Sequence, residues 1–374
     1  MLTGQFSETV YLSWLASCRL PLKTLTELLK NFDTAEEIYR MFTEHSDELT
    51  ATGTNRETMA VMRKNAYPDK LRAFESINEK GRIRGISLRD PEYPELLREI
   101  SDPPAILFYR GDLSILKKTC LAMVGSRNAS VKGLSATERI ARDLSNHGIV
   151  IVSGLADGID SAAHRGCITG GTPTAAVMGC GLDRIYPVTN TALSQKILET
   201  GGLLLSEYAP GEKPLGWHFP VRNRIISGLC KATLMMECKI RSGSMTTIRH
   251  ALDQGRDVYA YPGETGTPWS EGAHQLLREG AGYFTTAADI LDDLGCLDKS
   301  ESCVQNNVLV QEKTETDPVR SKIIEALKDG MLGFDELTVR TGLSPQELFT
   351  ALTVLMIRGT VTAYPGKMYE LTVN

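Results

Sequence analysis

The sequence lacks the signatures of several common function classes. It has no apolar run approaching the ~20 residues of a transmembrane helix, so we expect no helical membrane span. It has no Gly-x4-Gly-Lys-[Ser/Thr] loop, and no Gly-x-Gly-x-x-Gly follows the first strand of its predicted α/β region. These absences argue against the two best known nucleotide-binding loops, and we expect no cofactor.

Cysteine spacing argues against a metal site or a disulfide framework. The eight cysteines are scattered through 374 residues, and no two form a C-x-x-C pair. The first 20 residues include Glu8 and have no basic start, which is unlike a secretory signal. We therefore expect free thiols, no bound metal and a cytoplasmic protein.

An excess of positive charge is also missing, except in one stretch. The formal net charge is −5, which excludes a bulk polycation, yet residues 213–249 carry a net charge of +6. Concentrated positive charge is what contact with a nucleic-acid backbone requires, but a solvated basic face would have the same composition. The basic residues of this stretch are Lys213, Arg222, Arg224, Lys231, Lys239, Arg241 and Arg249, against Glu237.

The sequence does contain a clear strand–helix–strand unit at residues 121–164. Two apolar runs, 121–124 and 149–152, flank a segment whose apolar residues recur at helical spacing. Gly125-Ser-Arg127 follows the first run and Ser153-Gly154 begins the loop after the second. Because Gly125 has no Cβ, we expect it to let a phosphate approach the strand backbone. Loops at the carboxyl ends of parallel strands, and the helix N-termini behind them, are where α/β proteins bind anions. The unit therefore predicts a phosphate-bearing ligand.

The order of elements predicts the fold class and the domains. Strands and helices alternate to about residue 295, which indicates an α/β fold with a doubly wound, mostly parallel Rossmann-like sheet. The last helix of the tail, 345–357, has no basic residue, so we expect the tail to contact protein rather than duplex DNA. The predicted domains are a small N-terminal helical module at 1–66, a Rossmann-like DNA-binding domain with its lead-in at 67–297, a linker at 298–317 and a C-terminal winged-helix domain at 318–374.

The acidic residues and the histidine after the second strand have two interpretations. Asp157 and Asp160 stand three residues apart at a helix start, where they form either a catalytic carboxylate pair or, more commonly, a helix cap. His164, one turn into the same helix, is typical of a packing or capping histidine. No Ser/His/Asp or Cys/His arrangement stands out.

The stretch Phe219-Pro-Val-Arg-Asn-Arg224 is the most informative one. It places an aromatic ring and two arginines, on either side of Asn223, at a helix start. Arginines at positions i and i+2 do not share a helix face, so we expect that pairing them with interior carboxylates is awkward. Guanidinium groups on successive phosphates, with Phe219 or Trp217 stacking a base, fit single-stranded nucleic acid. A salt-bridged helix start is the alternative.

Together these motifs resemble the DNA-processing protein A (DprA/Smf) family. The resemblance covers about residues 90–290 and preserves the order of the motifs. The tail is similar to the winged helix of many members, and the N-terminal helices resemble more loosely their SAM-like or helix-hairpin-helix module. The motifs are Gly125-Ser-Arg127, Ser153-Gly-Leu-Ala-Asp-Gly-Ile-Asp160 with His164, Tyr186-Pro187, Ser206-Glu207, Phe219-Pro-Val-Arg-Asn-Arg-Ile-Ile226, Ser242-Gly-Ser244 with Thr247, and Pro262-Gly263.

The resemblance implies a non-enzymatic protein that handles DNA. Members bind and protect incoming single-stranded DNA in natural transformation, dimerise through the Rossmann-like domain and load RecA recombinase for homologous recombination. For this chain it implies a homodimer with single-stranded DNA and RecA as partners, and no membrane. The predicted DNA-binding residues are Gly125, Ser126, Arg127, Ser153, Gly154, Lys213, Phe219, Arg222, Asn223, Arg224, Lys239, Ser242 and Gly243.

A Rossmann-type enzyme, a nucleoside-monophosphate phosphoribohydrolase, is the alternative function. Pro262-Gly-Glu-Thr-Gly-Thr267 followed by Glu271 resembles the Pro-Gly-Gly-x-Gly-Thr-x-x-Glu signature of such enzymes. Glu264 replaces the second glycine, and Glu271 is one residue late. A carboxylate at position 264 would stand where a phosphate approaches the backbone, so we expect binding rather than hydrolysis.

Overall fold

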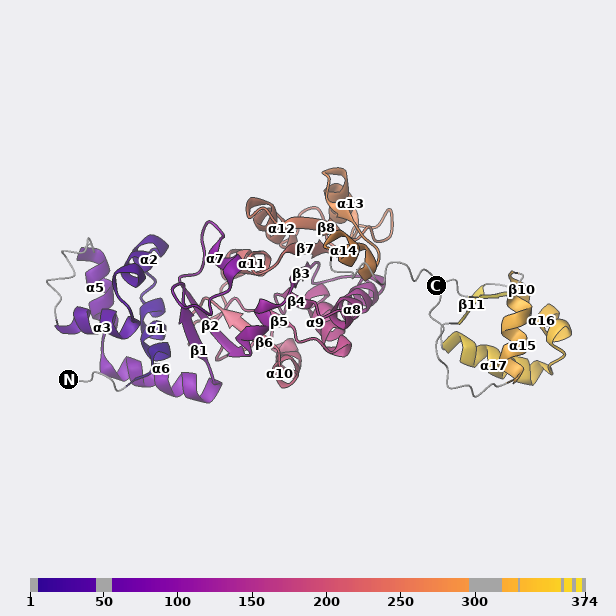
Figure 1. Ribbon diagram of the computed structural model, residues 1–374, viewed down its shortest axis with the longest axis horizontal. Coiled ribbons are helices and arrows are strands. Elements are labelled where there is room, and N and C mark those ends of the chain that lie inside the picture. Colours follow the sequence, from indigo (N-terminus) through magenta and orange to yellow (C-terminus); the bar gives the residue numbers. More distant parts are fainter. Residues whose placement is uncertain are drawn as a thin grey trace. The chain divides into compact units, whose positions relative to one another are not determined.

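The computed structural model describes residues 6–44, 56–295, 318–328, 330–357, 360–364 and 368–371 (Figure 1). The chain divides into two units, Met1–Leu297 and Asp298–Asn374, and each is treated separately below. The predicted linker, 298–317, lies outside the described residues.

The first unit begins with a group of short helices. Residues 10–15 of α1 are buried on all sides, because the helix packs against α3, α6 and the first strand. The apolar cluster around α1 continues into the sheet through Phe108 and Leu204, so the predicted boundary at residue 66 falls within a shared core and the separate helical module stays a proposal. The helices are α1 Glu8–Ser17, α2 Leu22–Asn31, α3 Ala35–Glu44, α5 Arg56–Asn65 and α6 Pro68–Gly81.

A nine-stranded sheet in the order β1-β2-β6-β5-β4-β3-β7-β8-β9 forms the centre of the first unit. The strands from β3 to β9 are parallel, β2 is antiparallel to β6, and β1 is antiparallel to β2. The predicted mostly parallel sheet is therefore confirmed. The strands are β1 Arg84–Ser87, β2 Ile106–Gly111, β3 Cys120–Val124, β4 Val150–Ser153, β5 Ala175–Val177, β6 Leu203–Ser206, β7 Ala232–Met235, β8 Asp257–Ala260 and β9 Gly282–Tyr283.

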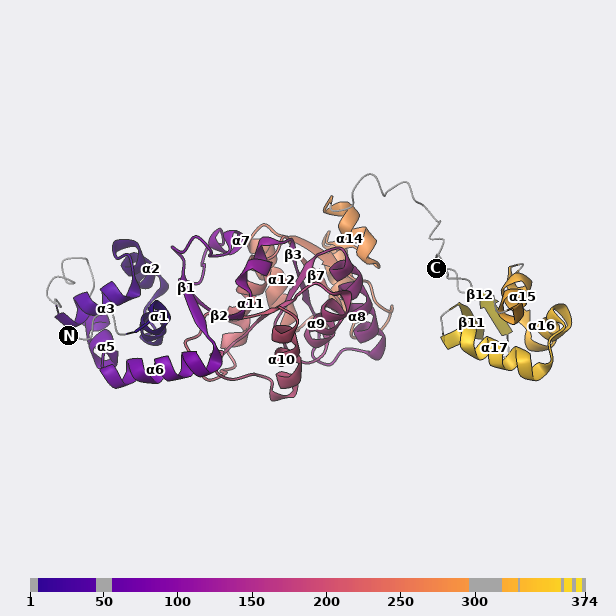
Figure 2. The same ribbon diagram turned by 60° about the horizontal axis from the view of Figure 1, so that its bottom comes forward.

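Helices cover both faces of this sheet (Figures 1 and 2). Alternate residues of β3 enter different cores: Cys120, Ala122 and Val124 pack with α11 and α12, whereas Leu121 and Met123 pack with α8 and α9. Full burial on both faces explains the unbroken apolar runs. The helices are α7 Glu95–Arg98, η2 Leu113–Lys117, α8 Val131–Asn146, α9 Ile159–Gly170, η3 Val188–Asn190, α10 Thr191–Glu199, α11 His218–Gly228, α12 Ser244–Asp253, α13 Glu271–Arg278 and α14 Ala287–Asp293.

The strand order reverses at β3. From β3 the chain proceeds outward through β4, β5 and β6 and then returns to place β7 on the other side of β3, followed by β8 and β9. In doubly wound folds the loops diverge at this point, and the crevice beyond the carboxyl ends of the strands is where ligands bind.

The second unit has winged-helix architecture, as predicted. Three helices pack on an antiparallel sheet with the order β10-β12-β11, around buried residues that include Leu337, Leu352 and Tyr369. Residues 365–367, between β11 and β12, lie outside the described residues. The elements are α15 Pro318–Leu327, β10 Leu332–Gly333, α16 Phe334–Thr341, α17 Pro345–Ile357, β11 Val361–Tyr364 and β12 Met368–Leu371.

Three properties of the described part of the chain bear on function. None of its helices combines the length and apolarity needed to cross a bilayer. It contains no group of three His, Cys, Asp or Glu side chains arranged to hold a metal ion. Its cysteines are buried and form no disulfides with one another, and burial raises the pKa of Cys120 and Cys238 to about 12, so neither thiol ionises at neutral pH.

Candidate nucleic-acid interface

The loops after several parallel strands meet at one edge of the sheet, which we call the carboxyl edge. Gly125-Ser-Arg127 follows β3, Gly154 follows β4, Tyr186 lies in the loop after β5, and 236–243 follows β7. Parallel strands end at the same edge, so residues that are far apart in the sequence are brought together.

The exposed centre of the carboxyl edge is formed by cations and aromatic rings. Phe219, in the first turn of α11, is half-buried, and the guanidinium carbon of the exposed Arg127 lies 5.7 Å from its ring centroid. On other sides Phe219 contacts Tyr186, at 5.3 Å between ring centroids, and Arg222, at 5.9 Å from guanidinium to ring. These residues, with Gly154, line a small cavity of about 60 Å³. An exposed guanidinium beside rings can bind a phosphate and stack a base in one place.

Arg222 lies beneath this centre and is only 4% exposed. Its guanidinium donates to the carbonyl of Gly154, at 3.0 Å, and to that of Val177. It therefore ties the end of β4 to the end of β5. Burial lowers the pKa of Arg222 to about 10, and the nearby Asp160 opposes this shift, so the side chain remains charged at neutral pH. Its position makes it the floor of the site rather than its surface.

Arg224 is also buried. We expected the i, i+2 spacing to make pairing with an interior carboxylate awkward, and for Arg224 this expectation was wrong. Its guanidinium donates to both carboxylate oxygens of Glu207, each at 2.7 Å, and its Nε lies 3.0 Å from Asp102. Burial lowers the pKa of Arg224, but the hydrogen bonds and charge of Glu207 and the charge of Asp102 outweigh burial, so the pKa is raised overall. The two arginines do lie on different helix faces, yet each face is covered by a different part of the core. The salt-bridged helix start therefore describes Arg224.

Two carboxylates of the protein occupy backbone N–H groups at the carboxyl edge, one at the start of α8 and one in the loop after β4. Glu237 accepts from the backbone and hydroxyl of Ser130, at 2.8 and 2.6 Å, at the start of α8. Asp160 accepts from the N–H groups of Gly154 and Ala156, at 3.1 and 3.3 Å. A carboxylate at a helix N-terminus satisfies the dipole that a phosphate would otherwise use. The expected phosphate position at the start of α8 is therefore already filled, whereas Asp160 occupies the N–H groups of the loop before α9.

The packing of the loop after β3 gives a different reason for the glycine at position 125 than the sequence suggested. A Cβ on Gly125 would lie 2.6 Å from Ile159 and 2.8 Å from the carbonyl of Glu237. Gly125 is thus required because the loop packs tightly against α9 and the end of β7, whereas we expected it to admit a phosphate.

The candidate carboxylates after β4 are separated by their surroundings. Asp160 is 8% exposed, and burial raises its pKa, which Arg222 and the two N–H groups oppose. Asp157 is exposed and accepts from the Thr189 hydroxyl at 2.9 Å. The expected helix cap is not found, because the N-cap of α9 is Gly158 and neither carboxylate bonds to the start of the helix. Asp160 instead supports the loop after β4 from inside, and Asp157 holds the loop after β5.

His164 is a packing residue, as the commoner interpretation held. Its ring is completely buried in α9, with Nδ1 2.8 Å from the Thr174 hydroxyl and Nε2 without a partner among the described residues. Burial lowers its pKa to about 3, and the positive charges of Arg222 and Arg165 add to the shift. The ring is therefore neutral at physiological pH.

The remaining predicted site residues divide by accessibility. Ser153 is completely buried and donates to the carbonyl of Met123 at 2.7 Å, so it lies in the core. Ser126 accepts from the N–H of Asn128 at 3.1 Å, and Asn223 donates to the carbonyl of Gly243 at 3.4 Å. Lys213, Lys239 and Gly243 are exposed, and Ser242 is half-buried.

The basic stretch 213–249 does not form one cluster. Lys231 precedes β7 and lies at the opposite, amino-terminal edge of the parallel strands. With Arg222 and Arg224 buried, the exposed cations of this stretch near the end of β7 are Lys239 and Arg241. Lys213 follows Glu212, which pairs with Arg19 of the helical group.

Tyr186 belongs to one of the motifs that resemble the family, but it is not among the predicted DNA-binding residues. Its ring is 40% exposed and contacts Phe219. The rule that loops after parallel strands share an edge could have found it, because it lies in the loop between β5 and α10. Trp217, considered for base stacking, is 59% exposed just before α11.

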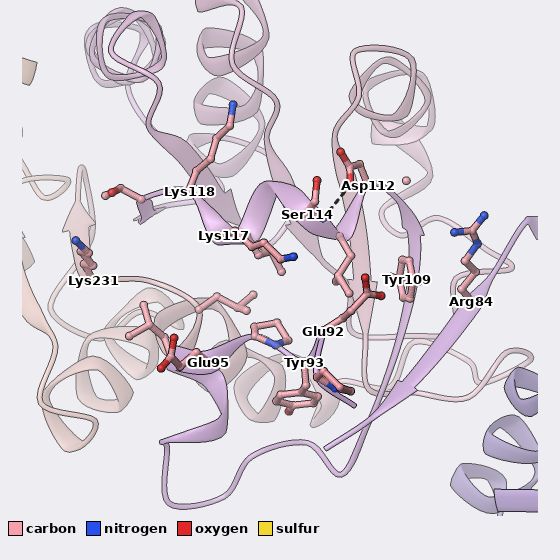
Figure 3. Close-up of a pocket in the computed structure, with 18 residues that line it drawn as sticks. Arg84, Glu92, Tyr93, Glu95, Tyr109, Asp112, Ser114, Lys117, Lys118 and Lys231 are labelled. Atoms are coloured by element: carbon pink, nitrogen blue, oxygen red, sulfur yellow. Dashed lines mark hydrogen bonds between the residues drawn. The ribbon is translucent and has the colours of Figure 1, made fainter. Parts of the chain in front are cut away.

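A much larger cavity is found at the amino-terminal edge. It encloses about 660 Å³ and is drawn in Figure 3. Cations and carboxylates are intermixed around it, namely Arg84, Lys117, Lys118 and Lys231 with Glu92, Glu95 and Asp112. Its volume exceeds that of the carboxyl-edge cavity, but its mixed charge does not define one class of ligand.

The fold and the site define a class: a Rossmann-like protein whose switch-point edge carries an exposed arginine against aromatic rings, followed by a winged helix. The family model of DNA recombination-mediator protein A matches residues 84–295, and that of the DprA winged helix domain matches residues 310–367. The chain therefore belongs to the DNA-processing protein A (DprA/Smf) family, as its motifs predicted, and is a DNA-processing protein.

Individual relatives agree with this assignment. DNA processing protein DprA of Streptococcus pneumoniae is 48% identical over 205 residues, which cover 55% of this chain and 72% of that protein. Protein Smf of Escherichia coli is 37% identical over 280 residues, 75% of each chain.

Solved structures show the same fold. The X-ray structure of the Streptococcus pneumoniae protein aligns with a TM-score of 0.64 and 37% identity, over 76% of this chain and 98% of that one. The structure of DNA processing protein A from Helicobacter pylori, which gave insights into that protein's single-stranded DNA binding mode, aligns with a TM-score of 0.51 and 28% identity, over 57% of this chain and 97% of that one.

Proposed function

We propose that this chain binds single-stranded DNA across the carboxyl edge of its sheet. The observation that carries the proposal is the exposed Arg127 over Phe219, with Tyr186 beside it. A guanidinium pairs with phosphate oxygens in a fork that lysine cannot copy, and exposed rings stack unpaired bases of any sequence. The single-stranded DNA binding of the Helicobacter pylori relative supports the same ligand.

In this proposal the buried residues position the exposed ones. Arg222 holds the ends of β4 and β5 together under Phe219, and Arg224 anchors α11 to Glu207. Lys239 and Arg241 add positive charge beyond β7. The proposal is tested by asking whether the exposed residues among those predicted to bind DNA, above all Arg127, contact the strand.

Binding of single-stranded DNA is tested by titrating labelled single-stranded and duplex oligonucleotides of the same length over a salt series. We expect tighter binding of the single strand, with log affinity falling by about 0.7 per phosphate contact for each unit of log salt. Equal affinity for both ligands, or affinity that does not depend on salt, would contradict the proposal.

We further propose that the bound strand is incoming DNA in natural transformation and that the protein, as a homodimer through its Rossmann-like domain, loads RecA on it in the cytoplasm. The description of the family as a recombination mediator supports this role. The measurement is the rate of RecA filament assembly on protein-coated single-stranded DNA. We expect faster assembly when this protein is present, and an unchanged rate would refute the loading role.

We propose binding without turnover. Glu264, which replaces a glycine of the hydrolase signature, is exposed and lies 3.3 Å from Lys132, and Glu271 is in the first turn of α13. A carboxylate at position 264 opposes a substrate phosphate there. Incubation with nucleoside monophosphates should release no free base, whereas release that depends on Glu271 would establish the enzyme.

A further inference from the structure

A second group of cations surrounds a cleft at the other edge of the sheet. Lys80 and Arg82 come from the end of α6, Arg84 from the start of β1 and Arg110 from the end of β2, where β2 runs antiparallel to β6. These four residues line a cavity of about 560 Å³, which we call the amino-edge cleft.

The positive charge of the amino-edge cleft is not neutralised by the protein. Glu199 is the one acidic residue among those that line it, and its carboxylate is engaged along α10 with Lys196, at 3.9 Å, and Gln195, at 3.3 Å. Lys80, Arg82 and Arg84 are exposed, and within the described part of the chain none of them forms an ion pair.

Arg110 shows the imbalance most directly. Its guanidinium donates to the carbonyl of Leu182 at 3.3 Å, but its Nε is buried without a partner among the described residues. Burial lowers its pKa, and the like charge of Arg82 lowers it further. Two arginines that repel one another are stabilised when an external anion binds beside them.

The adjoining cavity of Figure 3 shares Arg84 with the cleft but has mixed charge. Its cations Lys117, Lys118 and Lys231 are accompanied by the carboxylates of Glu92, Glu95 and Asp112, so the excess of positive charge belongs to the cleft itself. The rings that line these cavities are buried, since Tyr93 is 3% and Tyr109 is 7% exposed. Cations without an exposed ring suit phosphates but offer no surface on which a base can stack.

We propose that the amino-edge cleft is a second DNA-contact site, which takes the phosphates of the sugar–phosphate backbone and does not read or stack the bases. The proposal rests on the single-stranded DNA binding proposed above. The five residues of β3 make the sheet about 16 Å deep, and β2 lies four places from β3, which at about 4.8 Å per strand adds roughly 19 Å across the sheet. A strand several times longer than the carboxyl-edge site is therefore needed to reach both sites.

The test compares two labelled oligothymidines, one of about 6 nucleotides, which is within the size of a single strand-binding site, and one several times longer. The variant combines Lys80→Gln, Arg82→Asn and Arg84→Gln; asparagine is chosen because Arg82 has a φ of 51°, which asparagine tolerates. The matched control, Lys23→Gln/Lys30→Gln/Arg40→Gln, removes three exposed positive charges from α2 and α3.

We expect the cleft variant to bind the long strand at least about fivefold more weakly, with its salt slope reduced by about 2, while the short strand and the control are unchanged. If the triple variant unfolds early, Lys80→Gln/Arg84→Gln, which leaves position 82 intact, takes its place.

Two results would overturn the assignment. The first is a folded variant that binds the long strand as tightly as the wild type. The second is a variant that no longer binds inorganic pyrophosphate, measured by calorimetry, but still binds DNA with wild-type affinity, which would make the cleft a site for small anions. If the proposed function is wrong, the result is different, because the wild type then binds neither oligonucleotide. In that case the inference about the cleft is wrong as well.

Discussion

Arginines at the carboxyl edge have different roles because their surroundings differ. Arg127 is exposed and contacts a ring, Arg222 bonds to backbone carbonyls under that ring, and Arg224 pairs with Glu207 in the interior. Only an exposed guanidinium can exchange water for phosphate at low cost. The buried ones act by holding the backbone, so their loss should appear first as lost stability.

Replacing Arg127 with alanine should weaken single-stranded DNA binding and leave stability unchanged. A base stack or charged hydrogen bond contributes roughly 1–3 kcal/mol, so we expect a loss of ~5- to 150-fold in affinity. Arg127→Lys should recover only part of it, because lysine lacks the planar fork.

Fluorescence anisotropy and thermal melting measure the two quantities for Arg127. The control is Arg142→Ala, which removes an exposed arginine from the distant part of α8. A variant that melts early yet binds DNA normally once folded would show that Arg127 is structural.

Replacing Arg224 with alanine should destabilise the fold. The side chain is 7% exposed and Glu207 is 16% exposed, so its removal leaves a largely buried carboxylate unpaired. Losing one partner of such a pair costs about 3–5 kcal/mol. Urea unfolding measures the change. Wild-type stability together with lost DNA binding would return Arg224 to the predicted DNA-contact surface.

His164 should make stability depend on pH. Its folded pKa, about 3, is below the unfolded value of 6.5, so the unfolded chain binds the extra proton between these values and stability falls as the pH drops below about 6.5. At pH 5 the loss from this group is about 2 kcal/mol. His164→Gln should therefore reduce the difference in unfolding free energy between pH 7.5 and pH 5, and equal differences in both proteins would contradict the assignment.

At the scale of elements, the loops of the carboxyl edge are held by internal carboxylates rather than left open for a ligand. Glu237 bonds Ser130, the N-cap of α8, and Asp160 bonds the loop after β4, so the side chains proposed to contact DNA project from a preformed backbone. Preformed loops lose little conformational freedom when a ligand binds.

This packing predicts the effect of Gly125→Ala. The new Cβ would meet the Glu237 carbonyl at 2.8 Å, which is backbone and cannot turn aside. Overpacking of this kind costs typically about 1–3 kcal/mol. Urea unfolding should show that loss, with weaker DNA binding because Arg127 is displaced. Unchanged stability with weaker binding would instead support the original expectation that Gly125 admits a phosphate.

At the scale of the whole molecule, the winged-helix unit differs from the first unit in the side chains proposed to contact a partner. The winged-helix unit exposes apolar side chains, Phe349 at 62% and Val339 at 84%, and α17 carries no basic residue. Exposed apolar residues on neighbouring helices are typical of protein contact. We propose that this unit, joined through 298–317, contacts a protein partner.

Deleting residues 318–374 should therefore leave single-stranded DNA affinity within about threefold, because few phosphate contacts are removed. Anisotropy titrations of the shortened and full chains at equal salt make the comparison. A large loss would identify the winged helix as a DNA-contact domain.

The sequence by itself determined the architecture. Apolar runs of four or five residues alternate with helical periodicity, and burial on both faces of a parallel sheet is the physical reason that such runs appear. The loops at the carboxyl edge and the packing role of His164 also followed from local pattern, because strand direction and burial are written into neighbouring residues.

Only the tertiary structure decided which charges face solvent. The stretch 213–249 reads as one basic cluster, but α11 and β7 carry Lys231 to the amino edge and turn Arg224 toward Glu207. Likewise, the partner of Ser130 at the start of α8 is Glu237, 107 residues away along the chain. Ion pairs and close backbone contacts depend on which distant segments the fold brings within a few ångströms of one another. The spacing of residues along the sequence does not contain that information.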